Sequence, residues 1–193
     1  MALDTVMMEE DAQVVFTATE GKLTARSLRF APLLSATGWK AFGMPFTSAV
    51  IKNSTEEEIS APSAQNVDNG IWFARLKDNK TPEFVVDESA FGMAGLWAAN
   101  GDTYTISSEG AFEFKTLEEP AAPTETGTFL MCSNPNTFTI TLKQSAYILT
   151  ADGTSFEQEA NPEIKPFQSF VLTDAKTLST LRSLRIGDGR SEE

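Results

Sequence analysis

Hydrophobic and polar residues alternate along much of the chain, in short runs that are separated by Gly, Asn, Asp and Pro. In the clearest run, 137–143, the side chains of Phe138, Ile140 and Leu142 fall on one face, and threonine and lysine side chains fall on the other. A period of two is typical of half-buried β-strands. Helical spacing of apolar residues is confined to 174–184, which predicts one turn of helix before a last strand.

These runs predict an all-β fold, namely a two-layer antiparallel β-sandwich with at most one short helix near residues 174–183. The whole chain, 1–193, is expected to form one domain, because halves shorter than about 120 residues would each have a thin β core. An internal boundary would fall at the Pro- and Ala-rich connector 118–126, and the polar stretch 53–70 is expected to be an exposed loop. The expected strands are 13–17, 23–30, 39–46, 71–76, 84–86, 95–98, 103–107, 111–116, 128–132, 137–143, 146–150, 155–158, 167–172 and 183–186.

For one hairpin, the sequence predicts which residues of the two strands face each other. Asp152-Gly153 is a typical two-residue turn in which both residues need positive φ. Centring the turn on this pair places Leu149 opposite Phe156, so that both apolar side chains fall on one face.

A second hairpin is predicted within 104–114. A three-residue loop that ends in a left-handed Gly110 places Ile106 opposite Phe112, whereas a two-residue turn would place Ile106 opposite Glu113. The longer loop is favoured, because a slip of one residue would turn an apolar face outward.

The composition is that of an ordinary globular protein: of 193 residues, 41% are hydrophobic and 22% are charged. The net charge of −12 would repel a nucleic-acid backbone, so we expect no nucleic-acid partner. The chain contains no histidine, which removes the commonest general base and the commonest metal ligand. The single cysteine, Cys132, excludes an intramolecular disulfide and is expected to pack as a small apolar side chain. We expect neither a metal nor another cofactor.

Two tryptophans are candidates for ligand binding. Trp72 and Trp97 each stand beside turn residues, where an indole ring at a sheet edge can stack on a sugar ring. Packing against a loop is the alternative for both, and Trp39, which leads a predicted strand, is expected in the core.

Pairs of carboxylates catalyse glycoside hydrolysis when a cleft holds them at a fixed separation. Glu83, Asp87, Glu88 and Asp102 are candidates for such a pair. With 27 acidic residues in the chain, a solvated surface is the simpler explanation for all four.

Four motifs follow one another along the chain: Gly-Trp-Lys-Ala-Phe-Gly-Met-Pro-Phe at 38–46, Ala-Tyr-Ile-Leu-Thr-Ala-Asp-Gly-Thr-Ser-Phe at 146–156, Ile-Lys-Pro-Phe-Gln-Ser-Phe at 164–170 and Leu-Arg-Ile-Gly-Asp-Gly at 184–189. In this order and spacing they resemble the β-rich domains near the C-termini of secreted and cell-surface proteins of Bacteroides-like bacteria. The resemblance extends over about 28–189. It implies a non-catalytic β-sandwich module of an exported protein, often attached to adhesin-like or glycan-handling regions, and it implies no catalytic residue.

We therefore expect a non-catalytic extracellular or cell-surface module that acts in adhesion or in binding of a glycan or a surface protein, and we leave its oligomeric state open. The chain shows neither a signal peptide nor a lipid-anchor sequence, and no run of about 20 apolar residues predicts direct membrane insertion. Two alternatives remain. One is a carboxylate-only glycoside hydrolase or lyase, and the other is a pilus-like structural subunit that assembles by strand addition through its segment 1–17.

Overall fold

The computed structural model describes residues 1–16, 22–31, 39–43, 49–59, 71–86, 94–99, 103–116 and 118–186. Its elements, in chain order, are β1 Ala2–Glu9, β2 Leu23–Ala31, β3 Lys40–Phe42, β4 Ala49–Lys52, β5 Glu58–Ile59, β6 Ile71–Leu76, β7 Phe84–Val86, β8 Gly95–Ala99, β9 Thr105–Ser108, β10 Phe112–Phe114, β11 Phe129–Ser133, β12 Ile140–Thr141, β13 Ala146–Leu149, β14 Ser155–Glu159, β15 Glu163–Ile164, β16 Ser169–Thr173, α1 Ala175–Thr180 and β17 Ser183–Arg185. The predicted all-β, sandwich-like fold with one short helix near 174–183 is confirmed.

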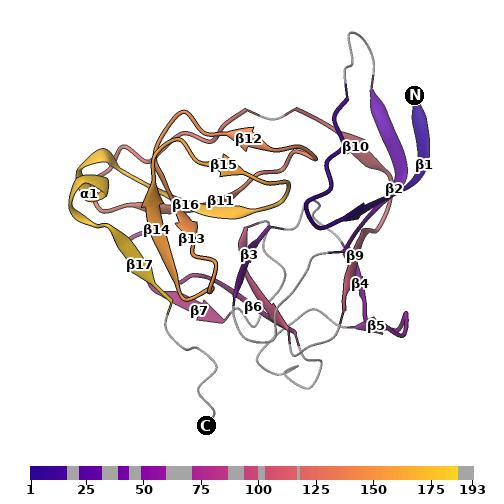
Figure 1. The fold of residues 1–193 in the computed structure, drawn as a ribbon, viewed down its shortest axis with the longest axis horizontal. Helices are drawn as coiled ribbons and strands as arrows, with labels where there is room; N and C mark the ends of the chain where they lie inside the picture. Colours follow the sequence, from indigo (N-terminus) through magenta and orange to yellow (C-terminus); the bar gives the residue numbers. More distant parts are fainter. Residues whose placement is uncertain are drawn as a thin grey trace.

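Within the described ranges, the strands form four sheets (Figure 1). A six-stranded sheet has the order β1-β2-β9-β4-β5, with β10 also paired to β2. The central sheet has the order β3-β8-β6-β7, a five-stranded sheet has the order β11-β16-β13-β14-β17, and β12 pairs with β15 in a small sheet. The six-stranded and five-stranded sheets lie at opposite sides of the view in Figure 1, with β3 and β6 of the central sheet between them.

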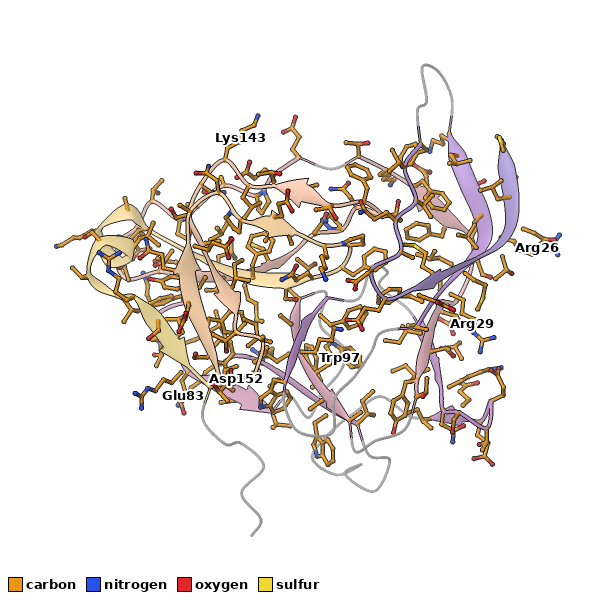
Figure 2. All side chains as sticks on the ribbon, viewed as in Figure 1. Arg26, Arg29, Glu83, Trp97, Lys143 and Asp152 are labelled. Carbon is orange, nitrogen blue, oxygen red and sulfur yellow. The ribbon has the colours of Figure 1, made fainter. Side chains whose placement is uncertain are left out.

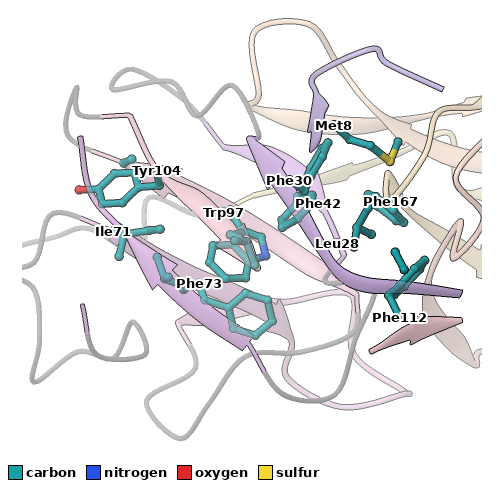
Figure 3. Close-up of a cluster of buried hydrophobic side chains, with 14 of the residues drawn as sticks. Met8, Leu28, Phe30, Phe42, Ile71, Phe73, Trp97, Tyr104, Phe112 and Phe167 are labelled. Atoms are coloured by element: carbon teal, nitrogen blue, oxygen red, sulfur yellow. The ribbon is translucent and has the colours of Figure 1, made fainter. Parts of the chain in front are cut away.

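The central sheet buries both of its faces, because alternate residues of each strand enter different cores. On β8, Trp97 belongs to the first core, which the central sheet shares with the six-stranded sheet, and Leu96 and Ala98 belong to the second core, which it shares with the five-stranded sheet. Phe73 on β6 faces the first core and Ala74 the second. Figure 3 shows the first core. The sandwich thus has an additional layer, and the small sheet covers a third core on the outer face of the five-stranded sheet.

The prediction of a hairpin within 104–114 is wrong. Strands β9 and β10 do not face each other; both pair antiparallel with β2, one after the other. Ala25 pairs with Phe112, and Phe30 pairs with Ile106. The segment from Ile106 to Phe112 is therefore one residue longer than the segment of β2 that it faces, as in a β-bulge. The Ser108 hydroxyl oxygen accepts a bond from the Leu28 amide at 3.0 Å, and the hydroxyl donates to the Gly110 carbonyl at 2.7 Å. These bonds support the bulge, so Gly110 needs no left-handed backbone and has none.

The register of the β13–β14 hairpin is as predicted, with Leu149 opposite Phe156. The turn itself differs from the prediction. Of the two central residues, Gly153 takes left-handed backbone (φ 69°) and Asp152 does not. The amide of Thr150 donates to the Ser155 carbonyl at 2.8 Å, which closes a longer loop.

Other differences come from pairing between distant segments. The predicted strand at 13–17 is not a strand over 13–16; the preceding segment forms β1 instead, in parallel register with β2. The predicted strand at 137–143 is reduced to β12, because 137–139 bonds to the N-terminal segment through the Val14 amide and the Thr137 carbonyl at 2.7 Å. Residues 17 and 44–46 of the predicted strands lie outside the described residues.

The two segments that were predicted to lack strands, 53–70 and 118–126, differ in the structure. In the stretch expected as a loop, 53–59 contains the short strand β5, and 60–70 lies outside the described residues. The connector 118–126 runs from the six-stranded to the five-stranded sheet. It is bonded to the chain that precedes β13, because the Lys143 amide donates to the Glu119 carboxylate at 2.9 Å and the Gln144 side-chain amide donates to the Pro120 carbonyl at 2.6 Å.

Candidate functional site

A pocket of about 360 Å³ opens where segments from three sheets meet. Its walls come from β3, the turn that follows β1, the β13–β14 turn and the segment 165–168. We call it the β3 pocket. Clefts of this size that combine apolar walls with a few convergent polar groups are the usual form of small-ligand sites.

Lys40 enters the pocket because of the alternation along β3. Trp39 and Ala41 belong to the second core and Phe42 to the first, so the side chain of Lys40 points to the same side as Phe42, toward the six-stranded sheet. Phe42 stacks on Phe30, with ring centroids 5.3 Å apart, and these two nearly buried residues form part of the pocket lining. The ammonium of Lys40 forms an ion pair with the Glu10 carboxylate.

The turn after β1 brings two acidic side chains to this place. The Ala12 amide donates to the Glu9 carbonyl at 3.1 Å, and Asp11 takes left-handed backbone (φ 64°), which reverses the chain. Glu10 then faces Lys40, and the carboxylate of Asp11 lies 2.6 Å from the ammonium of Lys165. The pocket therefore holds two lysines and two carboxylates in matched pairs.

Burial and the nearby Lys165 ammonium lower the pKa of Lys40 to about 8. An ionised Glu10 acts in the opposite direction, because a neighbouring negative charge favours the ammonium. The pocket thus holds a lysine whose proton is less firmly bound than in water, in an ion pair with Glu10.

Asn134 holds the wall formed by 165–168. Its side chain is fully buried, and its amide group donates to the carbonyls of Ile164 and Lys165 at 3.0 and 3.1 Å. On the backbone, the Phe167 amide donates to the Asn134 carbonyl at 2.8 Å, and the Asn134 amide donates to the Gln168 carbonyl at 3.0 Å. Sequence reasoning did not find this residue; the available signal was the turn-forming triplet Asn-Pro-Asn at 134–136.

The expectation that Trp97 projects from a sheet edge is wrong. Trp97 has no exposed surface, and its ring meets Phe42 and Phe73 edge-on with centroids 5.4 Å apart in both cases. The physical reason is that β8 is an inner strand of a sheet that is covered on both faces. Figure 2 shows Trp97 among the central strands.

Trp72 is half-buried and packs at the margin of the second core. It does not line the β3 pocket. Its binding role stays a prediction. Trp39 is 8% exposed in the second core, as expected.

Of the four candidate carboxylates, Glu83 alone lies within the described residues. Glu83 is exposed and pairs with Lys77 at 3.0 Å beside the β6–β7 turn (Figure 2). Asp87, Glu88 and Asp102 lie outside the described residues. Within the described ranges, no group of three or more acidic, cysteine or histidine side chains is placed to hold a metal ion. Catalysis by a carboxylate pair stays a prediction.

Cys132 is half-buried against the third core. Burial raises the pKa of its thiol to about 11. This shift agrees with the expectation that Cys132 packs as an apolar side chain, because it disfavours the reactive thiolate.

No protein-family model, curated protein or solved structure matches the chain. Among the described residues, no helix is both long enough and apolar enough to cross a membrane.

Proposed function

We propose that this protein is a non-catalytic β-sandwich module of the cell surface or extracellular space, and that it binds a glycan in the β3 pocket. The observation that carries the proposal is the pocket itself, in which charged and amide side chains converge over the nearly buried Phe30 and Phe42. The extracellular location is supported by the resemblance of its motifs to domains of exported proteins.

The composition of the pocket suits a sugar. A sugar ring carries hydroxyl groups at its edge, which both donate and accept hydrogen bonds, and carbon-bound hydrogens on its faces. The rim offers acceptors on Asp11 and donors on Lys165, while Gln168 offers both. Because each lysine is matched by a carboxylate, the rim favours a polar ligand without a large net charge.

A glycan array tests the proposal. Lys165 is the preferred position to change, because its side chain is 62% exposed and its loss leaves the cores intact. We expect Lys165→Ala to weaken binding by about tenfold, since one charge-assisted hydrogen bond is removed. Lys77→Ala is the matched control, because Lys77 is also exposed (54%) and ion-paired but lies outside the pocket. Failure of the protein to bind any glycan, or equal binding by both variants, would contradict the proposal.

Assembly by strand addition is a second candidate function, favoured by the position of β1. This strand lies at the edge of the six-stranded sheet and pairs in parallel with β2 from Ala2 to Glu9. Met8 is buried in the first core, whereas Met1 and Met7 are 84% and 61% exposed. The same pairing made by β1 of another copy would join two subunits.

Analytical ultracentrifugation over a range of concentrations tests this candidate. Strand addition predicts oligomers that grow with concentration and are lost when residues 1–9 are removed. A monomer at every concentration, or oligomers that persist in the shortened chain, would rule it out.

A further inference from the structure

We infer that the outer edge of β1 is a dimer interface, at which β1 pairs antiparallel with β1 of a second copy of this chain. The inference goes beyond glycan binding and does not depend on it. It also differs from assembly by strand addition, because each β1 stays on β2 of its own subunit and uses only its outer edge. The two six-stranded sheets then continue across the pair of subunits.

β1 is the longest edge strand in the part of the chain that the structure describes. It has eight residues, and Figure 1 shows it at the margin of the fold beside β2. The other described strands at sheet edges have two to five residues. Short strands, lysine, proline and bulges commonly protect an edge from pairing with another chain. β1 is long, has neither lysine nor proline and keeps one unbroken register with β2, so its edge suits a partner strand.

Alternate residues of β1 direct their backbone groups away from β2. The Thr24 amide donates to the Met1 carbonyl at 3.1 Å, so the backbone groups of Met1 and of every second residue after it face β2. Those of the intervening residues face outward. These residues are Ala2, Asp4, Val6 and Met8. In an antiparallel pair they form the hydrogen-bonded positions, and Leu3, Thr5 and Met7 form the other positions.

The side chains favour one antiparallel register of the two β1 strands. Placing Thr5 opposite Thr5 of the second copy places Leu3 opposite Met7, twice by symmetry. These three side chains share one face of the strand, because they are two residues apart. Met7 is exposed in the single chain, and this register brings an apolar side chain against it.

The neighbouring registers are less favourable. Centring the pair on Asp4 would place two carboxylates directly opposite each other, which is destabilising. Centring it on Val6 would place Leu3 opposite the charged Glu9. The first register avoids both contacts, and Asp4 keeps its ion pair with Arg26 of its own subunit at 3.7 Å.

Analytical ultracentrifugation of the full chain measures the dimer. We expect the mass to double as the concentration rises and to go no higher, because a symmetric pair is closed. Met7→Lys is expected to weaken the dimer by about tenfold or more, since it places an ammonium against Leu3 of the second copy. Val15→Lys is the matched control, because Val15 is also exposed but lies outside β1, and it is expected to dimerise like the wild type. A monomer at every concentration, or a Met7→Lys dimer as stable as the wild type, would overturn the inference.

Cysteine cross-linking tests the register. Thr5→Cys places two thiols at the symmetry axis, where Cα atoms at such a position are about 4.5 Å apart, within the range of a disulfide. We expect a disulfide-linked dimer on mild oxidation. Asp4→Cys is the matched control, because this exposed position lies on the other face and its two copies are more than about 7 Å apart, so we expect no link.

The same experiments separate this dimer from exchange of β1 between copies. In an exchanged dimer each β1 would lie against β2 of the other copy, so Thr5→Cys would give no link and Met7→Lys would have no effect. Either result, or an equal link from Asp4→Cys, would contradict the pairing of the two β1 edges. None of these results bears on glycan binding, which is measured separately with Lys165→Ala.

Discussion

Gly153 packs directly on the backbone of Trp39. A β-carbon at position 153 would lie 2.5 Å from the carbonyl oxygen of Trp39 and 2.8 Å from its amide nitrogen. The β13–β14 turn therefore rests on the residue that precedes β3, and this contact helps to position Lys40 and the wall of the β3 pocket.

Three glycines are expected to differ in what they tolerate. Gly153→Ala combines a clash with backbone at φ 69°, and we expect it to lower the free energy of unfolding by about 2 kcal/mol or more. Gly127 has φ 74° but open space around it, so Gly127→Ala is expected to cost about 1 kcal/mol from backbone strain alone. Gly110→Ala has neither problem, and we expect a change within about 0.5 kcal/mol. Urea denaturation measures all three, and a large loss for Gly110→Ala would contradict the bulge described above.

Asp174 is expected to make stability fall in acid. Its carboxylate caps α1 by accepting bonds from the Lys176 and Thr177 amides at 3.0 Å, and it accepts a third from the Gly127 amide at 2.8 Å. Hydrogen bonding from Thr177 and from these amides holds the pKa of Asp174 well below its ordinary value of 3.8. Folding thus favours the ionised form, so the contribution is complete at neutral pH and is lost as the pH falls below 3.8 toward the folded pKa.

The variant Asp174→Asn tests this dependence. We expect a melting temperature lower by a few degrees at neutral pH and a difference from wild type that shrinks at pH near 3. Asp4→Asn is the control, because the side chain of Asp4 is 85% exposed. A constant difference between Asp174→Asn and wild type at all pH values would show that the charge of Asp174 has no part in capping.

The two tryptophans are expected to respond differently to truncation. Trp97→Ala should cost about 3–5 kcal/mol, because it leaves a large cavity in the first core. Trp72→Ala should cost about 1–2 kcal/mol, because the ring is half-buried and less surface is lost. Denaturant unfolding measures both, and a nearly neutral Trp97→Ala would contradict its position in the core.

Cys132 is expected to be unreactive in the folded protein. With a thiol pKa raised to about 11, the thiolate fraction at pH 8 is roughly a hundredfold smaller than at the ordinary value of 9.0. We expect modification by a disulfide reagent to be slower by a similar factor than in the urea-unfolded chain. Equal rates in the two states would show that burial does not protect this thiol.

Local patterns in the sequence predicted part of the fold. Strands β6 and β7 have the bounds that alternation and flanking turn residues indicate, and the Leu149–Phe156 register follows from the turn and the apolar face. The pairing of β1 with β2 was not predictable in this way, because a parallel pair has no turn signal between its strands. The 104–114 error has the same origin: the local hairpin signal was outweighed by pairing with distant β2.

The candidate site was much less predictable than the strands. Glu10, Lys40 and Lys165 come from segments far apart in sequence, and none belongs to a recognisable motif for binding. Only the folded chain brings them together. Trp97 shows the converse, since neighbouring turn residues suggested exposure, whereas the layer on each face of the central sheet buries it.

Amide chemical-shift mapping with a glycan selected on the array tests most directly whether the β3 pocket is the binding site. We expect shifts on titration to concentrate at residues 149–151 and 165–168 and to saturate with one affinity, and we expect Lys165→Ala to weaken that affinity. Shifts concentrated around Trp72 and β7, or no shifts with any glycan tested, would contradict it.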